Sequence, residues 1–256
     1  MSDEKSGAPK MDRRALLKFV GAGAAASALS PVSGQADASR SGMHDHAMNA
    51  SRAPEAAAAA AVTPAPASYV FLNADEAAFI EAAVDTLIPS DDVGPGAREL
   101  GVAVFIDRQL ASGYGRGDRL YLQGPFIEGT PEQGYQMRMT PSELMQAGIA
   151  DVNAHVREKF QSSFDLLSPQ DRAAVLTELE TRKLALPTVP TATFFELLYD
   201  LTMLGYFSDP IHGGNQGKGS WKMIGFPGIG AMYADKIAEY RNKRYMVDPV
   251  SIQDLL

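Results

Sequence analysis

The stretch DPIHGGNQGKGSWKMIGFPG, from Asp209 to Gly228, contains residue types that a phosphate-binding loop would need. A phosphate loop requires Gly, four residues, Gly, Lys and then Ser or Thr, whereas three residues separate Gly213 from Gly217 here. The spacing of the later glycines also fails the dinucleotide fingerprint, and an apolar helix rather than a strand is expected before them. The stretch therefore reads as either a buried structural loop or a surface shaped for a partner.

Nucleophilic catalysis would need a serine, a histidine and an acid in one place. His212 is the best candidate base, but Ser220 lacks the Gly-x-Ser-x-Gly turn that exposes a nucleophile. His155 falls near an apolar helical stripe and is expected to be a hydrogen-bonded core residue. His44 and His46 lie in a low-complexity segment, where solvation is the usual state. No complete active site is evident, and an independent enzyme that uses His212 or a small-molecule-binding module remain alternatives.

Composition narrows the function further. The 256 residues contain no cysteine, so this sequence cannot form disulfides or ligate an iron–sulfur cluster through thiolates, and it has no attachment site for c-type haem. The formal net charge is −8, which argues against binding to nucleic acid or to an anionic membrane surface. We expect no cofactor or metal bound by this chain.

Residues 1–38 are typical of a twin-arginine export signal. Arg13 and Arg14 precede Lys18 and a weakly apolar run of about eleven residues, which is too short to span a bilayer. The twin-arginine route carries folded cargo, so we expect a periplasmic protein. Residues 39–67, rich in alanine and proline, are expected to form a disordered linker.

Residues 68–256 are predicted to form a single, irregular, mainly α-helical domain with long Gly/Pro-rich loops. Capping signals predict helix starts at Asn73, Thr140, Ser168 and Thr193. Two further helices are expected at Ala97–Ala111 and Ala231–Arg241, and a short strand at Leu120–Leu122.

The helix that begins near Thr193 is the most apolar and should be central. Its expected core positions are Phe194, Leu197, Leu198, Leu201 and Leu204. It leads directly into the stretch Asp209–Gly228, where the density of glycine and proline predicts no helix.

Several ordered motifs, together with the twin-arginine leader, resemble one known family. They are Leu72-Asn73 with Phe79-Ile80, Ile88-Pro89-Ser90-Asp91, Gly96-Ala97 before Val104-Phe105-Ile106-Asp107, Phe194-Phe195-Glu196-Leu197, Asp209-Pro210 with Gly213-Gly214-Asn215, and Gly219 through Trp221-Lys222 to Gly225-Phe226-Pro227-Gly228. This pattern is similar to the small subunit (subunit 3, or gamma) of gluconate 2-dehydrogenase and related membrane-bound sugar dehydrogenases.

The resemblance implies a noncatalytic subunit. In that family a separate FAD-containing large subunit oxidises the substrate, and electrons pass to a multihaem cytochrome c at the membrane. The small subunit binds the flavoprotein and supplies the signal that the twin-arginine translocase reads. Because this sequence has no cysteine, its association with a flavoprotein would be noncovalent.

The partner interface is expected on the Gly/Pro-rich stretch, at Gly213, Gly214, Asn215, Trp221, Lys222, Phe226 and Pro227. A rigid aromatic on a glycine-shaped loop is the kind of residue that dominates binding energy. Truncation of Trp221 to alanine would then cost at least ~2 kcal/mol of complex stability. The alternative is that Trp221 is a core residue of the domain.

Overall fold

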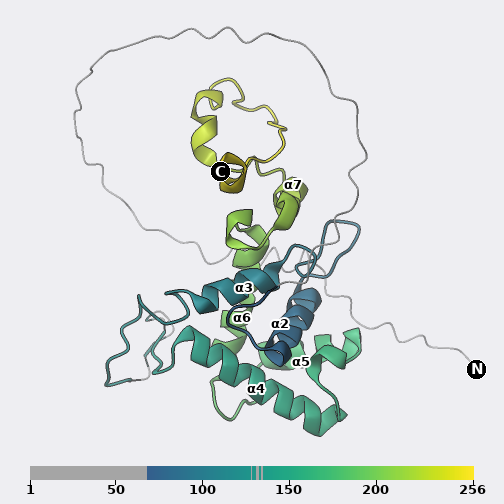
Figure 1. Ribbon diagram of the computed structural model, residues 1–256, viewed down its shortest axis with the longest axis vertical. Helices are drawn as coiled ribbons and strands as arrows, with labels where there is room; N and C mark the ends of the chain where they lie inside the picture. The colour runs from purple at the N-terminus through teal and green to yellow at the C-terminus, as the bar shows by residue number, and fades with distance from the viewer. Residues whose placement is uncertain (1–67, 128, 131–132, 134) are drawn as a thin grey trace, which may run out of the picture. The chain divides into compact units, whose positions relative to one another are not determined.

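The computed structural model describes residues 68–127, 129–130, 133 and 135–256. The export signal with Arg13, Arg14 and Lys18, and the linker 39–67, lie outside the described residues. The described chain is mainly helical, as predicted (Figure 1). Its α-helices are α2 (Ala74–Leu87), α3 (Val102–Ala111), α4 (Pro141–Phe160), α5 (Pro169–Glu180), α6 (Thr191–Phe207) and α7 (Gly219–Ile224). Short 3-10 turns are η3 (Phe164–Leu166), η4 (Pro210–His212), η5 (Gln216–Lys218), η6 (Gly230–Lys236) and η7 (Ile252–Leu255).

Three predicted helix caps are confirmed. Asn73 and Thr140 each form a reciprocal capping box, with Glu76 and Glu143. The Ser168 hydroxyl accepts from the amide of Asp171 at the start of α5. Each such cap stabilises its helix by about 1 kcal/mol.

The predicted start of α6 is wrong by three residues, since the N-cap is Pro190 rather than Thr193. The helix begins at Thr191 after an extended Pro190, and no cap at Thr193 forms. Thr191 is held by the preceding turn instead, because its hydroxyl donates to the Leu184 carbonyl at 2.9 Å and accepts from the Leu186 amide at 3.0 Å.

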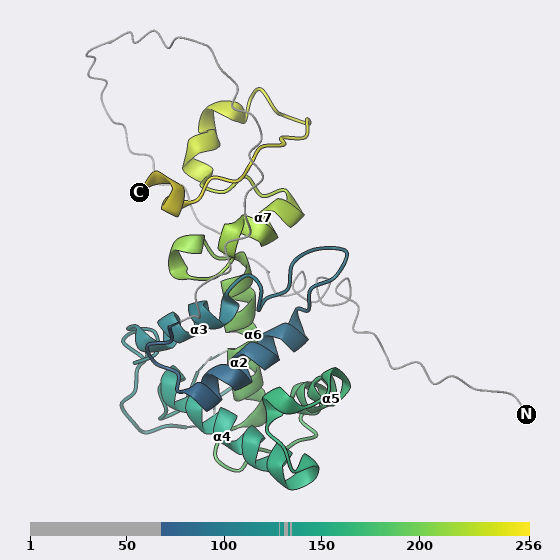
Figure 2. The same cartoon turned by 45° about the vertical axis from the view of Figure 1, so that its right-hand side comes forward.

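Helix α6 is central, as predicted, since it packs against α3, α4 and α5 (Figures 1 and 2). Its buried face is Phe194, Leu198, Leu201, Thr202, Gly205 and Tyr206. The prediction for Leu204 is wrong, because the residue lies off this face and is 59% exposed. Leu197 is only partly buried. No described helix is long and apolar enough to cross a membrane.

Three other predicted elements are wrong. Helix α3 begins at Val102 rather than near Ala97, because Gly101 adopts a left-handed conformation with φ 73°. At Leu120–Leu122 there is no strand, and both leucine side chains lie over Gly117 in an irregular segment. The expected C-terminal α-helix is only the 3-10 turn η6, followed by further turns.

A buried carboxylate on α3 fixes the first described residues. The Asp107 side chain is 1% exposed and accepts from three successive backbone amides, those of Val70, Phe71 and Leu72, each at 2.9 Å. A carboxylate that accepts several backbone N–H groups is a strong, charge-assisted anchor. The chain therefore enters the domain at a position set by α3.

Candidate functional site

The stretch Asp209–Gly228 is more regular than predicted. It contains η4 and η5 and, against expectation, the short helix α7. Between Gly219 and Gly225 the sequence has no glycine or proline, which permits about one and a half turns. Left-handed residues at Lys218 (φ 59°) and Gly225 (φ 71°) bound the helix on either side.

Within this stretch, the three residues of the Gly213-Gly214-Asn215 motif are buried. At Gly214 the backbone approaches the Gly205 carbonyl at the end of α6 so closely that a Cβ atom would collide with it. The backbone amide of Gln216, the residue after the motif, donates to the Leu100 carbonyl at 3.0 Å. The motif therefore joins the loop to α6 and to the turn before α3.

The Asn215 side chain organises the interior of the loop. The residue is fully buried, its Nδ2 donates to the Ser208 carbonyl at 2.9 Å, and its Oδ1 accepts from the amide and the hydroxyl of Ser220 at 3.0 and 2.8 Å. Both ends of the amide are thus satisfied. Ser220, whose hydroxyl is committed to this bond and inaccessible, is not placed to act as a nucleophile.

Asn215→Ala is expected to lower the free energy of unfolding by about 2–3 kcal/mol, because it leaves buried groups of Ser208 and Ser220 without partners. Asn242→Ala is the matched control. Asn242 also has a positive φ, 60°, but is exposed, so this variant carries the same backbone strain without the buried network. Urea unfolding of both variants measures the difference. Equal destabilisation of the two would show that the amide network contributes nothing.

Trp221 is part of the folded interior of this chain. It is 6% exposed, its Nε1 donates to the Phe207 carbonyl at 2.8 Å, and its ring meets that of Phe226 edge to face with centroids 5.1 Å apart. Phe226 is 42% exposed, and Lys222 is also exposed. Contact of these residues with a partner stays a prediction, and the side chains that reach the surface are Lys222 and Phe226.

The C-terminal residues close over the same loop. The Ile252 amide donates to Asp209 Oδ2 at 2.8 Å, and Lys218 Nζ lies 2.7 Å from Asp254 Oδ2. The hydrogen bond from Lys218, followed by those from the Ser251 amide and hydroxyl, lowers the pKa of Asp254 from 3.8 to about 2.

This contact is expected to weaken in acid. The pKa of Asp254 is depressed in the folded chain, so its contribution is present above pH 3.8 and is lost as the pH falls towards 2. The protection factor against hydrogen exchange of the Ser251 amide, which donates to Asp254 Oδ2 at 2.7 Å, should fall as the pH is lowered from 5 to 2. Lys218→Met is the control, since the protection factor of the Ser251 amide should already be lower at pH 5 in this variant. A titration of Asp254 near 3.8 in the wild-type chain would contradict the assignment.

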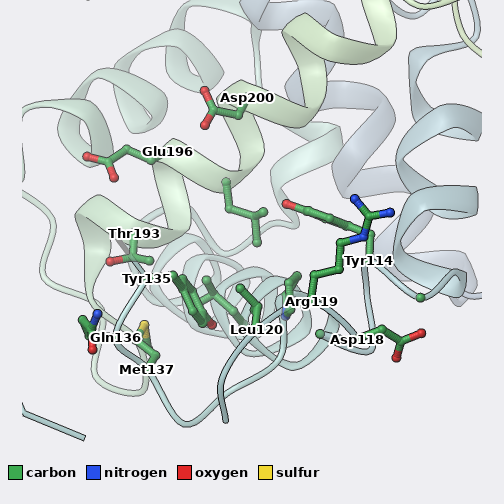
Figure 3. Close-up of a pocket in the computed structure, with 15 residues that line it drawn as sticks. Tyr114, Asp118, Arg119, Leu120, Tyr135, Gln136, Met137, Thr193, Glu196 and Asp200 are labelled. Carbon is green, nitrogen blue, oxygen red and sulfur yellow. The ribbon is translucent and has the colours of Figure 1, made fainter. Parts of the chain in front are cut away.

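A cavity of about 1010 Å³ lies between α6 and the irregular segment that follows α3 (Figure 3). Glu196 and Asp200 reach it from α6, and Tyr114, Arg119 and Tyr135 face it from the irregular segment. Burial raises the pKa of Asp200, and it raises that of Tyr135 to about 12, so the tyrosine hydroxyl is neutral at pH 7. The described lining includes no Ser–His or Cys–His pair.

Neither of the two described histidines, His155 and His212, lines this cavity. His212 is exposed at the end of η4 and is not among the residues that line it. His155 is half-buried, and its Nε2 lies 4.0 Å from Glu178 Oε2 without a hydrogen bond, so the prediction of a hydrogen-bonded core histidine is wrong for that nitrogen. Among the described residues, no three His, Asp or Glu side chains gather as metal ligands would.

Sequence reasoning named Asp107 within a motif and Asn215 as an interface residue, but it missed the structural role of each. Asp107 was noticed only within a motif, although a carboxylate on the buried face of an apolar helix signals a backbone anchor. Asn215 carries no comparable signal, because its role depends on a left-handed conformation (φ 46°) that the sequence does not specify.

Comparison with known proteins gives one match. The sequence model of the family described as gluconate 2-dehydrogenase subunit 3 matches residues 74–228, from the start of α2 to the end of the Gly/Pro-rich stretch. No curated protein and no solved structure matches.

Proposed function

The chain belongs to the gluconate 2-dehydrogenase subunit 3 family, and from that membership we propose that it is the noncatalytic small subunit of a periplasmic, FAD-dependent sugar or sugar-acid dehydrogenase. It binds the FAD-containing large subunit, which carries the substrate site. Its export signal directs the pair to the twin-arginine translocase. A multihaem cytochrome c subunit at the membrane receives the electrons. Localisation in the periplasm follows from the export signal.

The family match is the observation that carries this proposal. It covers α2 to α6 and the buried Gly213-Gly214-Asn215 motif, which are the parts that give the domain its core and its loop. The paired Arg13 and Arg14, followed by Lys18, support the export role. Trp221 and Phe226, whose rings are in contact, have different roles in this proposal. The buried Trp221 stabilises the loop, and the exposed Phe226 contacts the flavoprotein.

The test is co-expression of the full chain with the FAD-containing subunit of its own complex. With Arg13→Lys and Arg14→Lys together, both proteins are expected to stay in the cytoplasm, measured as FAD-dependent dye reduction in the periplasmic fraction. Lys5→Arg with Lys10→Arg is the matched control, since it makes the same kind of charge-preserving exchange outside the paired arginines. Periplasmic flavoprotein at wild-type levels in the paired-arginine variant would refute export by this chain.

A further inference from the structure

Residues 229–249, here called the C-terminal loop, leave the domain and return to it at one point. A parallel bridge joins Gly228 to Val250, in which the Ile229 amide donates to the Val250 carbonyl at 2.9 Å and the Val250 amide donates to the Pro227 carbonyl at 3.0 Å. Gly228 has φ 93°, and a Cβ atom there would collide with the Val250 carbonyl. Figures 1 and 2 show this yellow segment leaving after α7 and coming back to the C-terminal turn. The loop begins where the family match ends.

The charge of the chain changes sign in this region. Residues 68–215 hold ten Lys/Arg and 21 Asp/Glu, a net charge of −11, whereas residues 216–256 hold six and four, a net charge of +2. In the C-terminal loop, Arg241, Lys243 and Arg244 are exposed. Within the part of the chain that the structure describes, none of the three forms an ion pair. The loop itself holds four Lys/Arg and three Asp/Glu, a net charge of +1, and three of its cations are exposed and outside any ion pair among the described residues.

The same loop exposes apolar side chains around an ordered aromatic cluster. Tyr245 packs edge to face on Tyr233 and Tyr240, with centroids 5.5 and 4.5 Å away, and the Tyr233 hydroxyl donates to the Pro227 carbonyl. Ile237 is 68% exposed and Met246 is 64% exposed. Tyrosine, methionine and arginine are the residues that protein–protein interfaces favour.

We propose that the C-terminal loop is a docking surface for an acidic surface, with an apolar centre, on the FAD-containing subunit, an inference that rests on the proposed function. The loop continues directly from Phe226 and Pro227, so it extends the expected contact rather than forming a separate one. Its three free cations complement an acidic partner and speed association. Its apolar side chains, which are exposed in the free chain, would be buried at the centre of the contact on binding.

A lipid surface fits these features less well. Membrane-surface binding generally uses a long amphipathic helix with a basic face, whereas the loop contains only the 3-10 turn η6.

The experiment compares two triple variants of the full chain for binding to the purified FAD-containing subunit of its own complex. Arg241→Gln/Lys243→Gln/Arg244→Gln is expected to raise Kd at least about tenfold at low salt, with the difference shrinking as salt screens the charges. Arg157→Gln/Arg182→Gln/Lys183→Gln, which removes three exposed charges on α4 and after α5, is expected to bind like wild type. Thermal unfolding checks that both variants are folded.

The outcomes separate the two proposals. If the wild-type chain does not bind the flavoprotein, the proposed function fails. If wild type binds and the loop variant binds equally well, the docking surface is refuted while the proposed function stands. Loop-dependent binding to phosphatidylglycerol vesicles, or loop-dependent self-association of the chain alone, would also refute it when flavoprotein binding is unchanged.

Discussion

Asp107→Ala is expected to lower the free energy of unfolding by about 3–5 kcal/mol, the range for breaking a buried charged network. The substitution removes the acceptor for the amides of Val70, Phe71 and Leu72. Leu72 is itself 6% exposed, so water cannot readily replace the lost carboxylate as the acceptor for its amide. Urea unfolding monitored by Trp221 fluorescence measures the loss.

Two companion variants make this result specific. Asp107→Asn keeps one oxygen acceptor and the side-chain shape, so its effect should be intermediate. Asp92→Ala removes an exposed carboxylate in the turn before α3 and should change stability by less than about 0.5 kcal/mol. If Asp107→Ala unfolded at the same urea concentration as Asp92→Ala, the anchor would be unimportant.

Trp221→Ala is expected to destabilise the folded chain by about 3–5 kcal/mol, the cost typical of truncating a large buried aromatic. The change empties the space between Phe226 and the end of α6 and leaves the Phe207 carbonyl without its donor. Thermal unfolding of the isolated chain, monitored by far-UV circular dichroism, detects this without any partner. The structure therefore favours the second of the two roles considered for Trp221, that of a core residue.

Phe226→Ala separates packing from binding. Phe226 is 42% exposed, so its loss should cost the fold much less while weakening association with the flavoprotein. Trp221→Phe keeps most of the ring but removes the Nε1 donor, and should fall between wild type and Trp221→Ala. A Trp221→Ala chain that melts like wild type yet fails to bind would reverse the assignment and make Trp221 an interface anchor.

The helical fold could be predicted from the sequence wherever the signals were local. Asn73 with Glu76 and Thr140 with Glu143 place side chains that satisfy the first amides of a helix, and such pairs act within four residues. The apolar run of α6 likewise marks a helix that is buried against several others. These features depend little on the rest of the chain.

The errors arose where contacts longer than one helical turn decide the structure. The α6 start moved because the hydroxyl of Thr191 is taken by the turn at Leu184, and α7 forms because its loop is packed against α6 through Gly214. The geometry of the candidate site depends on Asn215, whose bonds reach residues five and seven positions away through a left-handed backbone. Periodicity and capping patterns do not describe such contacts.

The bridge between Gly228 and Val250 makes the intervening segment replaceable as a cassette. Because its two ends are neighbours, a short glycine–serine tether can substitute for it at little entropic cost, as the closure penalty varies only slowly with length. Under the docking role proposed above, partner choice could then be altered in this segment while the sequence of the helices stays the same.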